Sequence, residues 1–153
     1  MFILLTLEKA LQEDAKYLAE IQKASFDDES QRFDNSEEGG GPPGYDSEEW
    51  QKDIMQHGHY FKILWNNDIV GGAIIFADQQ QAHCLGRIFI DPKFQDKGIG
   101  TLAIQAIESE FQNVSKWWLD TPQWSTKNHH FYAKCGYSKV GERNDEFIFE
   151  KFV

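Results

Sequence analysis

The turn formed by residues 95–101, with the sequence QDKGIGT, has the residue types of an anion-binding site. Its glycines, Gly98 and Gly100, allow the backbone to approach a ligand closely and to adopt conformations closed to other residues. A strand-like run ends just before this turn, and a helix-like run begins just after it, at residue 102. A helix start offers unpaired N–H groups and the positive end of the helix dipole. The sequence therefore predicts a site for a phosphate-bearing ligand, and we call residues 95–101 the glycine turn.

The spacing within the glycine turn differs from two common phosphate-binding motifs. No Gly-Lys-Ser/Thr follows at the spacing of a Walker loop, and the three glycines of a dinucleotide fingerprint are absent. A second notable segment, residues 131–137 (FYAKCGY), follows later in the chain.

Together, the two segments resemble the GCN5-related N-acetyltransferase (GNAT) family. The acetyl-CoA signature of that family reads Arg/Gln-x-x-Gly-x-Gly/Ala, and Gln95, Gly98 and Gly100 fill its places. Residues 131–137 are similar to the family's Phe-Tyr-x-Lys-x-Gly-Phe/Tyr segment. Two motifs in the right order and at the right separation are more specific than either alone, and the resemblance covers roughly residues 60–151.

The resemblance implies that acetyl-CoA is the acyl donor. Backbone groups of the predicted strand would pair with the pantetheine arm as an added strand does, through Ile88, Phe89 and Ile90. The glycine turn would bind the pyrophosphate, through Gln95, Asp96, Lys97, Gly98, Ile99, Gly100 and Thr101. Asn128, one helical turn before Tyr132, is also expected to reach CoA. Ser125 stands where the family often has Asn, and we expect it to cap the following helix.

Tyr132 is the predicted general acid. In the family, a tyrosine at this place commonly gives a proton to the CoA sulfur when the thiolate leaves. A phenol has a reference pKa of about 10, so it is protonated at neutral pH. The alternative is a packing tyrosine whose hydroxyl reaches a backbone partner.

The candidates for the general base are Asp120, His83 and His129. Asp120 lies at the carboxyl end of a predicted short strand. Parallel strands ending at Ile90 and Asp120 should splay around the thioester, and open α/β sheets bind ligands beyond such strand ends. The alternative for Asp120 is a turn residue before Thr121.

Composition predicts one globular domain over residues 1–153, with 41% hydrophobic and 14% aromatic residues. No apolar run is long enough to span a membrane. Cys84 and Cys135 are expected to be reduced, which favours a cytoplasmic protein. No set of four ligand-type residues has zinc-site spacing, so we expect no metal. The net charge of -10 argues against nucleic acid and anionic membranes as partners and suits a cationic acceptor.

Hydrophobic periodicity and turn residues predict the order of elements. Strands are expected at 2–7, 60–65, 69–77, 82–90, 116–120, 137–141 and 146–152. Helices are expected at 13–25, from Asp46 onward, at 97–111 and at 125–135. The acidic and glycine-rich segment 27–43 should form neither. This order matches the family fold: α/β (α+β), a mixed, mostly antiparallel sheet of six to seven strands, with helices on both faces and a splay between the fourth and fifth strands.

The acceptor pocket is expected to use the segment 26–50. An aromatic wall of Tyr45, Trp50, Trp117 and Trp124 is one interpretation, with Asp27, Asp28 and Glu29 attracting a cation. The alternative, which we prefer for most of these residues, is that the tryptophans are core and the acids are solvated. The segment 27–44 is a candidate lid that orders when the acceptor binds.

The predicted function is N-acetylation of a primary amine by direct attack on acetyl-CoA in a ternary complex. The acceptor is a small molecule or a peptide. Two alternatives stay open: a non-catalytic acyl-CoA-binding or sensor module, and an acyltransferase that uses another acyl-CoA. A homodimer is expected by analogy with the family alone.

Overall fold

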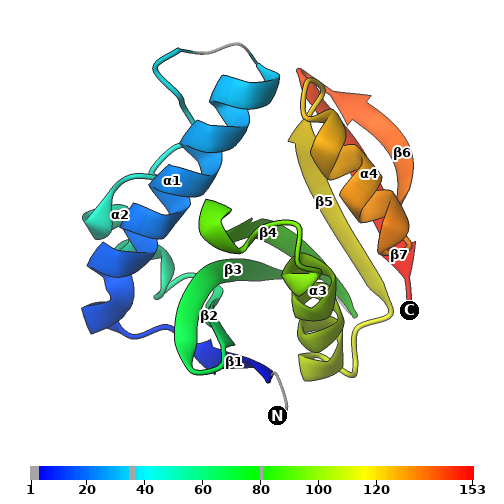
Figure 1. The fold of residues 1–153 in the computed structure, drawn as a ribbon. Coiled ribbons are helices and arrows are strands. Elements are labelled where there is room, and N and C mark those ends of the chain that lie inside the picture. Colours follow the sequence, from blue (N-terminus) through cyan, green and yellow to red (C-terminus); the bar gives the residue numbers. More distant parts are fainter. Residues whose placement is uncertain (1–3, 35–36, 80) are drawn as a thin grey trace.

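Seven strands form one mixed sheet in the part of the chain that the structure describes (Figure 1). This computed structural model describes residues 4–34, 37–79 and 81–153. The strand order is β1-β2-β3-β4-β5-β7-β6, and β4 and β5 form its parallel pair. The strands are β1 (Leu5–Lys9), β2 (His59–Trp65), β3 (Asp68–Gln79), β4 (Ala82–Ile90), β5 (Lys116–Pro122), β6 (Ser138–Arg143) and β7 (Glu146–Phe152). The predicted mixed, mostly antiparallel sheet is confirmed.

The sheet splays between β4 and β5. These strands pair only at their first residues, from Ala82 opposite Lys116 to Cys84 opposite Trp118. Beyond that point β4 remains paired with β3 as far as Ile90, and β5 remains paired with β7 as far as Pro122. Figure 1 shows the two strands diverging toward their carboxyl ends. The β5-facing edge of β4 therefore has no strand partner from residue 85 to residue 90, as the predicted splay requires.

Helices cover both faces of the sheet, because successive strand residues point to opposite sides. On β3, Ala73 and Ile75 pack in the core cluster that includes α3 (Ile99–Glu110) and α4 (Thr126–Lys134). Ile74 packs in the cluster that includes α1 (Ala15–Phe33) and α2 (Glu48–Ile54). Among the described residues, none of the helices combines the length and the apolar character needed to cross a membrane.

Helix α1 is longer than the sequence predicted. The expectation that no helix survives beyond Asp27 is wrong, because α1 continues to Phe33. Acidic residues at helical spacing from basic ones stabilise a helix. Asp27 lies 2.5 Å from Lys23, and Asp28 lies 3.6 Å from Arg32, both at i,i+4 spacing. The acidic run therefore belongs to the helix, and only the glycine-rich part that follows is a loop.

Several element bounds also differ from the predictions. β1 begins at Leu5 and continues to Lys9, and residues 2 and 3 of the predicted strand lie outside the described residues. The helix expected from Asp46 onward begins at Glu48, because Ser47 is its N-cap and the Ser47 hydroxyl accepts a hydrogen bond from Trp50 N–H at 3.1 Å. α3 and α4 begin at Ile99 and Thr126, slightly later than predicted.

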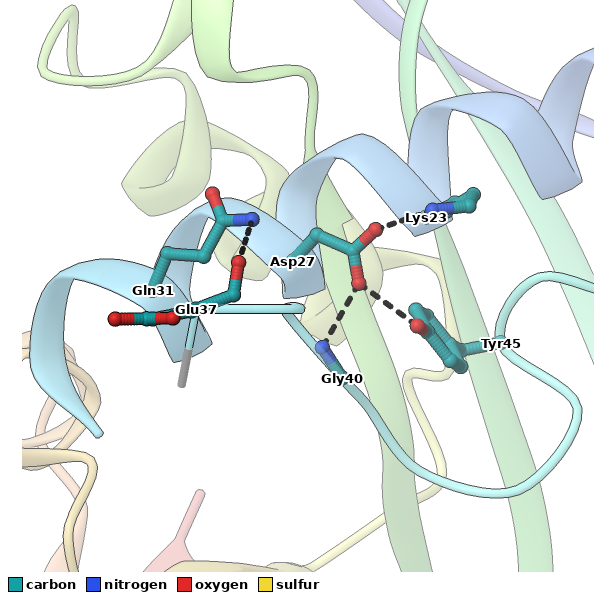
Figure 2. A network of polar contacts seen from close by, with 6 residues as sticks. All are labelled: Lys23, Asp27, Gln31, Glu37, Gly40 and Tyr45. Atoms are coloured by element: carbon teal, nitrogen blue, oxygen red, sulfur yellow. Dashed lines mark hydrogen bonds and ion pairs between the residues drawn. The ribbon is translucent and has the colours of Figure 1, made fainter. Parts of the chain in front are cut away.

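The segment 37–45 lies along α1 and is held there by Asp27, as Figure 2 shows. One carboxylate oxygen of Asp27 accepts hydrogen bonds from Gly40 N–H at 2.9 Å and from the Tyr45 hydroxyl at 2.7 Å. Gln31 adds a bond from its side chain to the Glu37 carbonyl at 3.4 Å. We call residues 37–45 the strap.

A buried polar network ties the end of the strap to the sheet. Arg87 of β4 donates to the Pro43 carbonyl at 2.6 Å and to the Gln22 side chain of α1 at 2.9 Å. Its guanidinium also stacks on the Trp50 ring at 4.0 Å. Gln22 and Gln51 are fully buried and bond to each other at 3.0 Å. Because its buried groups have partners, the network stabilises one arrangement of α1, α2 and β4.

Candidate functional site

A pocket of about 530 Å³ lies between α1, the end of β4, the glycine turn and α4. This volume is within the range of about 300–1,000 Å³ typical of small-molecule sites. Most of the predicted site residues line it: Ile88, Phe89, Ile90, Gln95, Asp96, Gly98, Ile99, Gly100, Thr101, Asn128 and Tyr132. Lys97 and Asp120 are not among the lining residues. The splay of the sheet thus brings segments far apart in the sequence around one cavity.

The glycine turn has the backbone conformation of an anion-binding loop. Asp96 and Gly98 have positive φ values of 61° and 79°, so the backbone adopts a left-handed conformation twice within three residues. The first backbone hydrogen bond of α3 runs from Leu102 N–H to the Gly98 carbonyl at 3.2 Å. The N–H groups of residues 99–101 precede this ladder and have no partner in it. Such concave sets of N–H groups at a helix start bind phosphate oxygens.

Gly100 allows α3 and α4 to approach closely beside the pocket. A Cβ atom at this position would lie 3.0 Å from Cζ of Phe131. A Cβ atom at Gly98 would meet nothing within 4 Å, so this position is open. The two glycines therefore have different roles: Gly98 shapes the turn, and Gly100 packs the helices.

Gln95 connects the glycine turn to both limbs of the splay. Its side-chain amide donates to the Ile90 carbonyl at 3.0 Å, and its oxygen accepts from Lys127 Nζ at 3.3 Å. Lys127 also lies 3.8 Å from the Asp96 carboxylate. The Ile90 carbonyl is therefore already bonded, and the turn is held against α4 at the edge of the pocket.

Tyr132 is buried in the core and lines the pocket with the small part that is exposed. Its ring packs against Tyr137 and Phe149. Its hydroxyl makes no hydrogen bond with any described residue. Burial raises the pKa of Tyr132, and the nearby charge of Glu29 raises it further. The phenol is thus protonated at neutral pH and available to donate to a ligand.

Glu29 of α1 reaches α4 across the pocket. The Ser125 hydroxyl and the Asn128 side-chain amide both donate to the same carboxylate oxygen, Oε1, the latter at 3.1 Å. Burial raises the pKa of Glu29. Ser125 is the N-cap residue of α4, as expected, but its side chain makes no capping bond and donates to Glu29 instead. In the described chain, no group of three or more His, Cys, Asp or Glu side chains is arranged to hold a metal.

The sequence suggested Glu29 only as one of three acids that attract a cation. It lies at helical spacing from the buried residues Ser25 and Gln22 on α1. That spacing places Glu29 on the inner face of α1. The sequence predicted a helix only as far as Ser25, so the helical pattern did not identify Glu29 as a site residue.

The candidate bases lie away from the pocket lining. Asp120 is exposed on β5, with its carboxylate 3.9 Å from the Arg143 guanidinium. His129 is bonded to the Pro122 carbonyl at 2.9 Å. His83 packs in an aromatic group with Phe111. Asp120 as the general base stays a prediction.

The expected aromatic wall does not line the pocket. Trp117 is fully buried in the core, and Trp50 stacks with Arg87. Tyr45 is hydrogen-bonded to Asp27, and Trp124 is also absent from the lining. The core interpretation is correct for Trp117. The aromatic residues that do line the pocket are phenylalanines and a tyrosine: Phe26, Phe33, Phe89, Phe94, Phe131 and Tyr132.

Comparisons with known proteins bear on this geometry. A family model described as the acetyltransferase (GNAT) family matches residues 15–137. YrkN of Bacillus subtilis (strain 168), described as uncharacterized, is 32% identical over 87 residues. The match covers 56% of this chain and 47% of YrkN, so the chain spans about half the length of that relative.

Solved structures with this fold include two N-acetyltransferases. The PaiA N-acetyltransferase from Thermoplasma acidophilum, in complex with coenzyme A, has a TM-score of 0.83 and 16% identity, over 97% of this chain and 99% of that one. The ribosomal-protein-S18-alanine N-acetyltransferase from Escherichia coli has a TM-score of 0.76 and 16% identity, over 98% of this chain and 94% of that one. At these identities the similarity shows the fold alone.

Proposed function

The chain belongs to the GNAT family of acetyltransferases, and from this premise we propose that it transfers an acetyl group from acetyl-CoA to a primary amine. The observation that carries the proposal is one pocket that joins the glycine turn, the edge of β4 without a strand partner and a buried tyrosine. The acceptor is a small molecule or a peptide. Cys84 and Cys135 are not joined by a disulfide, which supports a cytoplasmic location.

Different segments of this chain bind different parts of acetyl-CoA. The N–H groups of the glycine turn bind the pyrophosphate, and the positive φ of Gly98 orients the helix start toward it. The pantetheine arm pairs with the free edge of β4 beyond Leu85. The thioester then lies near the carboxyl ends of β4 and β5, where Tyr132 lines the pocket.

Tyr132 acts on the sulfur in this proposal. The reference pKa of a thiol is about 8.5 and that of a phenol about 10. Because burial raises the pKa of Tyr132 further, the phenol stays protonated and stabilises the developing thiolate as a hydrogen-bond donor. Its unpaired hydroxyl is free to make that bond.

The proposal is tested by transfer of labelled acetyl from acetyl-CoA to a panel of small amines and lysine-bearing peptides. We expect a labelled amide product that depends on both substrates. Binding of acetyl-CoA without transfer to any member of the panel would favour a non-catalytic CoA-binding module. Transfer from a longer acyl-CoA in preference to acetyl-CoA would change the donor and keep the reaction.

A further inference from the structure

Glu29 is the acidic residue of the pocket that lacks a positively charged partner among the described residues. Three carboxylates line the pocket, and the other two are paired. Asp28 lies 3.6 Å from Arg32, and Asp96 lies 3.8 Å from Lys127. Within the described chain, no Lys, Arg or His nitrogen lies within 4.0 Å of the Glu29 carboxylate. This carboxylate is partly buried, and a partly desolvated anion without a close ion pair is costly, so a bound cation would stabilise it.

The neutral partners of Glu29 orient its carboxylate without neutralising it. Ser125 and Asn128 both donate to Oε1. No described group donates a hydrogen bond to Oε2. Ser125 is fully buried, and Asn128 lines the same pocket as Glu29. The arrangement therefore holds one carboxylate oxygen in place and leaves the other for a ligand that carries hydrogen-bond donors.

The pocket that Glu29 lines also contains aromatic side chains. Phe26 and Phe33 come from the same helix, and Phe89 comes from β4. A ligand that fits these features has one cationic donor and an apolar body. A polycation would need several unpaired anions, whereas Asp27 and Asp28 already have basic partners on α1.

We propose that Glu29, oriented by Ser125 and Asn128, binds the attacking ammonium group of the acceptor through Oε2 and removes a proton from it. The acceptor class that follows is a primary monoamine on an apolar or aromatic body. This inference rests on the proposed function, whose transfer step supplies the reason for removing the proton.

The proposed transfer conserves protons, bonds and electrons. The acceptor ammonium gives one proton to the Glu29 carboxylate, and the neutral nitrogen attacks the thioester carbonyl. The N–C bond forms, the C–S bond breaks, and the sulfur leaves with the electron pair. The nitrogen loses a second proton as the amide forms. One of the two protons ends on the CoA sulfur, and the other is released to solvent.

The charged groups near Glu29 come from two elements. Burial is the main cause that raises its pKa, and Asp28 on α1 adds to the rise. Lys127 on α4 lowers the pKa, as do the bonds from Ser125 and Asn128. Tyr132 of α4 is neutral and responds to the charge of Glu29. A carboxylate with a raised pKa is a better base near neutral pH than an exposed one.

The variant Glu29→Gln keeps the size of the side chain and an oxygen for Ser125 and Asn128, and it removes the charge. Glu20→Gln makes the same change on the exposed face of α1 and is the matched control. The first probe pair is phenethylamine and its neutral analogue 2-phenylethanol, titrated into the CoA-loaded protein. We expect the wild type and Glu20→Gln to prefer the amine, and Glu29→Gln to bind it about tenfold more weakly or worse. If Glu29→Gln prefers phenethylamine over 2-phenylethanol as strongly as the wild type does, the proposal is overturned.

Turnover with phenethylamine gives a second readout. We expect Glu29→Gln to raise KM for the amine and lower kcat, with the affinity for acetyl-CoA unchanged. In the wild type, kcat/KM for the amine should fall as the pH drops through the raised pKa of Glu29, because the carboxylate becomes protonated. The pH profile of Glu29→Gln should show no inflection at that pKa. If the wild type turns over and Glu29→Gln matches it at every pH, Glu29 is not the amine site although the function stands. If no transfer occurs but Glu29 still governs amine binding, the proposed function fails and the subsite stands.

Thermal stability separates this role from a structural one. Folding raises the pKa of the Glu29 carboxyl group above its unfolded value of about 4.5. The folded protein therefore loses stability as the pH rises from this unfolded pKa through the folded pKa. The charged Glu29 therefore costs stability at pH 7, and Glu29→Gln should unfold at the same or a higher temperature there. A lower unfolding temperature for Glu29→Gln than for Glu20→Gln at pH 7 would identify Glu29 as a strut between α1 and α4 and contradict the proposal.

Discussion

Tyr132 combines the environment of a core residue with the free hydroxyl of a donor. Its ring packs against Tyr137 and Phe149, while its hydroxyl has no partner among the described residues. Because the hydroxyl makes no hydrogen bond within the described protein, removing it should cost little folding stability. The packing interpretation is therefore correct for the ring, but the backbone partner that it expected for the hydroxyl is absent among the described residues.

The variant Tyr132→Phe tests the hydroxyl alone. We expect kcat to fall by about 10²-fold, which is typical of losing a general acid or hydrogen-bond donor. Acetyl-CoA affinity and the unfolding temperature should stay close to those of the wild type, because the ring packing is kept. Steady-state kinetics and thermal unfolding measure these quantities. Unchanged turnover would mean that the thiolate leaves without help from Tyr132.

At the scale of elements, the start of α3 is the predicted phosphate site. Gly98 is the N-cap residue of α3 and has a left-handed conformation, with φ of 79° and open space where a side chain would begin. Any other residue here carries a backbone strain of about 1–2 kcal/mol. A single substitution therefore mixes strain with loss of binding, and a pair of matched variants is needed.

Gly98→Glu and Gly98→Gln share the strain and the bulk but differ in charge. We expect both variants to weaken acetyl-CoA binding, and Glu more strongly than Gln, because a carboxylate repels the phosphates. The difference should shrink at high salt, since mobile ions screen exposed charges. Calorimetric titration of acetyl-CoA at two salt concentrations measures it. Wild-type affinity in Gly98→Glu would exclude the glycine turn as the phosphate site.

The strap is a second element whose behaviour can be tested. It is bonded to α1 through Asp27 and to β4 through Arg87, as Figure 2 shows for the Asp27 contacts. Burial alone would raise the pKa of Asp27, but hydrogen bonds from Lys23, Tyr45 and Gly40 outweigh it and leave that pKa lowered. These bonds favour a strap that is already ordered over a lid that orders when the acceptor binds.

Asp27→Ala removes the acceptor of the two hydrogen bonds from the strap, those of Gly40 and Tyr45. We expect faster proteolysis within residues 37–45 in the variant, with acetyl-CoA affinity within about twofold of the wild type, because the strap does not line the pocket. Limited proteolysis followed by mass spectrometry locates the cleavage. In the wild type, cleavage that slows only when both substrates are bound would instead support the lid.

At the scale of the whole molecule, two limbs of one sheet separate at the place where the ligand is expected to bind. β4 and β5 pair at three positions, and side-chain bonds near the pocket link the limbs as well, from Glu29 to α4 and from Gln95 to Lys127. A ligand that contacts both limbs binds the folded chain and not the unfolded one, so it stabilises the folded state.

Acetyl-CoA should therefore raise the unfolding temperature in a concentration-dependent way. At 100 times Kd, binding to the folded state alone contributes about 2.7 kcal/mol. For a domain of this size, 1 kcal/mol corresponds to about 2–4 °C. Thermal unfolding across a series of acetyl-CoA concentrations measures the shift, and Gly98→Glu provides the control in which it should be reduced. An unfolding temperature independent of acetyl-CoA would contradict binding at this site.

The sequence by itself determined the features that depend on neighbouring residues. The glycine turn, Tyr132 and the order of strands and helices follow from local motifs and periodicity, because glycine conformation and helix starts are governed by a few adjacent residues. The mixed sheet followed from that order and from the family resemblance. The sequence did not predict the second half of α1, because an acidic run followed by glycines favours a loop, although Lys23 and Arg32 offer pairing partners at helical spacing.

Only the tertiary structure decided which side chains meet across the pocket. Glu29 and Ser125 are 96 positions apart in the chain, and no local pattern relates them. Likewise, the burial of Trp117, the exposure of Asp120 and the bond from Gln95 to Ile90 depend on where β4 and β5 separate. Long-range contacts arise from packing of whole elements, and packing sets burial, charge pairing and pKa. The conformation of the glycine turn was therefore readable from the sequence, whereas the contacts between α1 and α4 across the pocket were not.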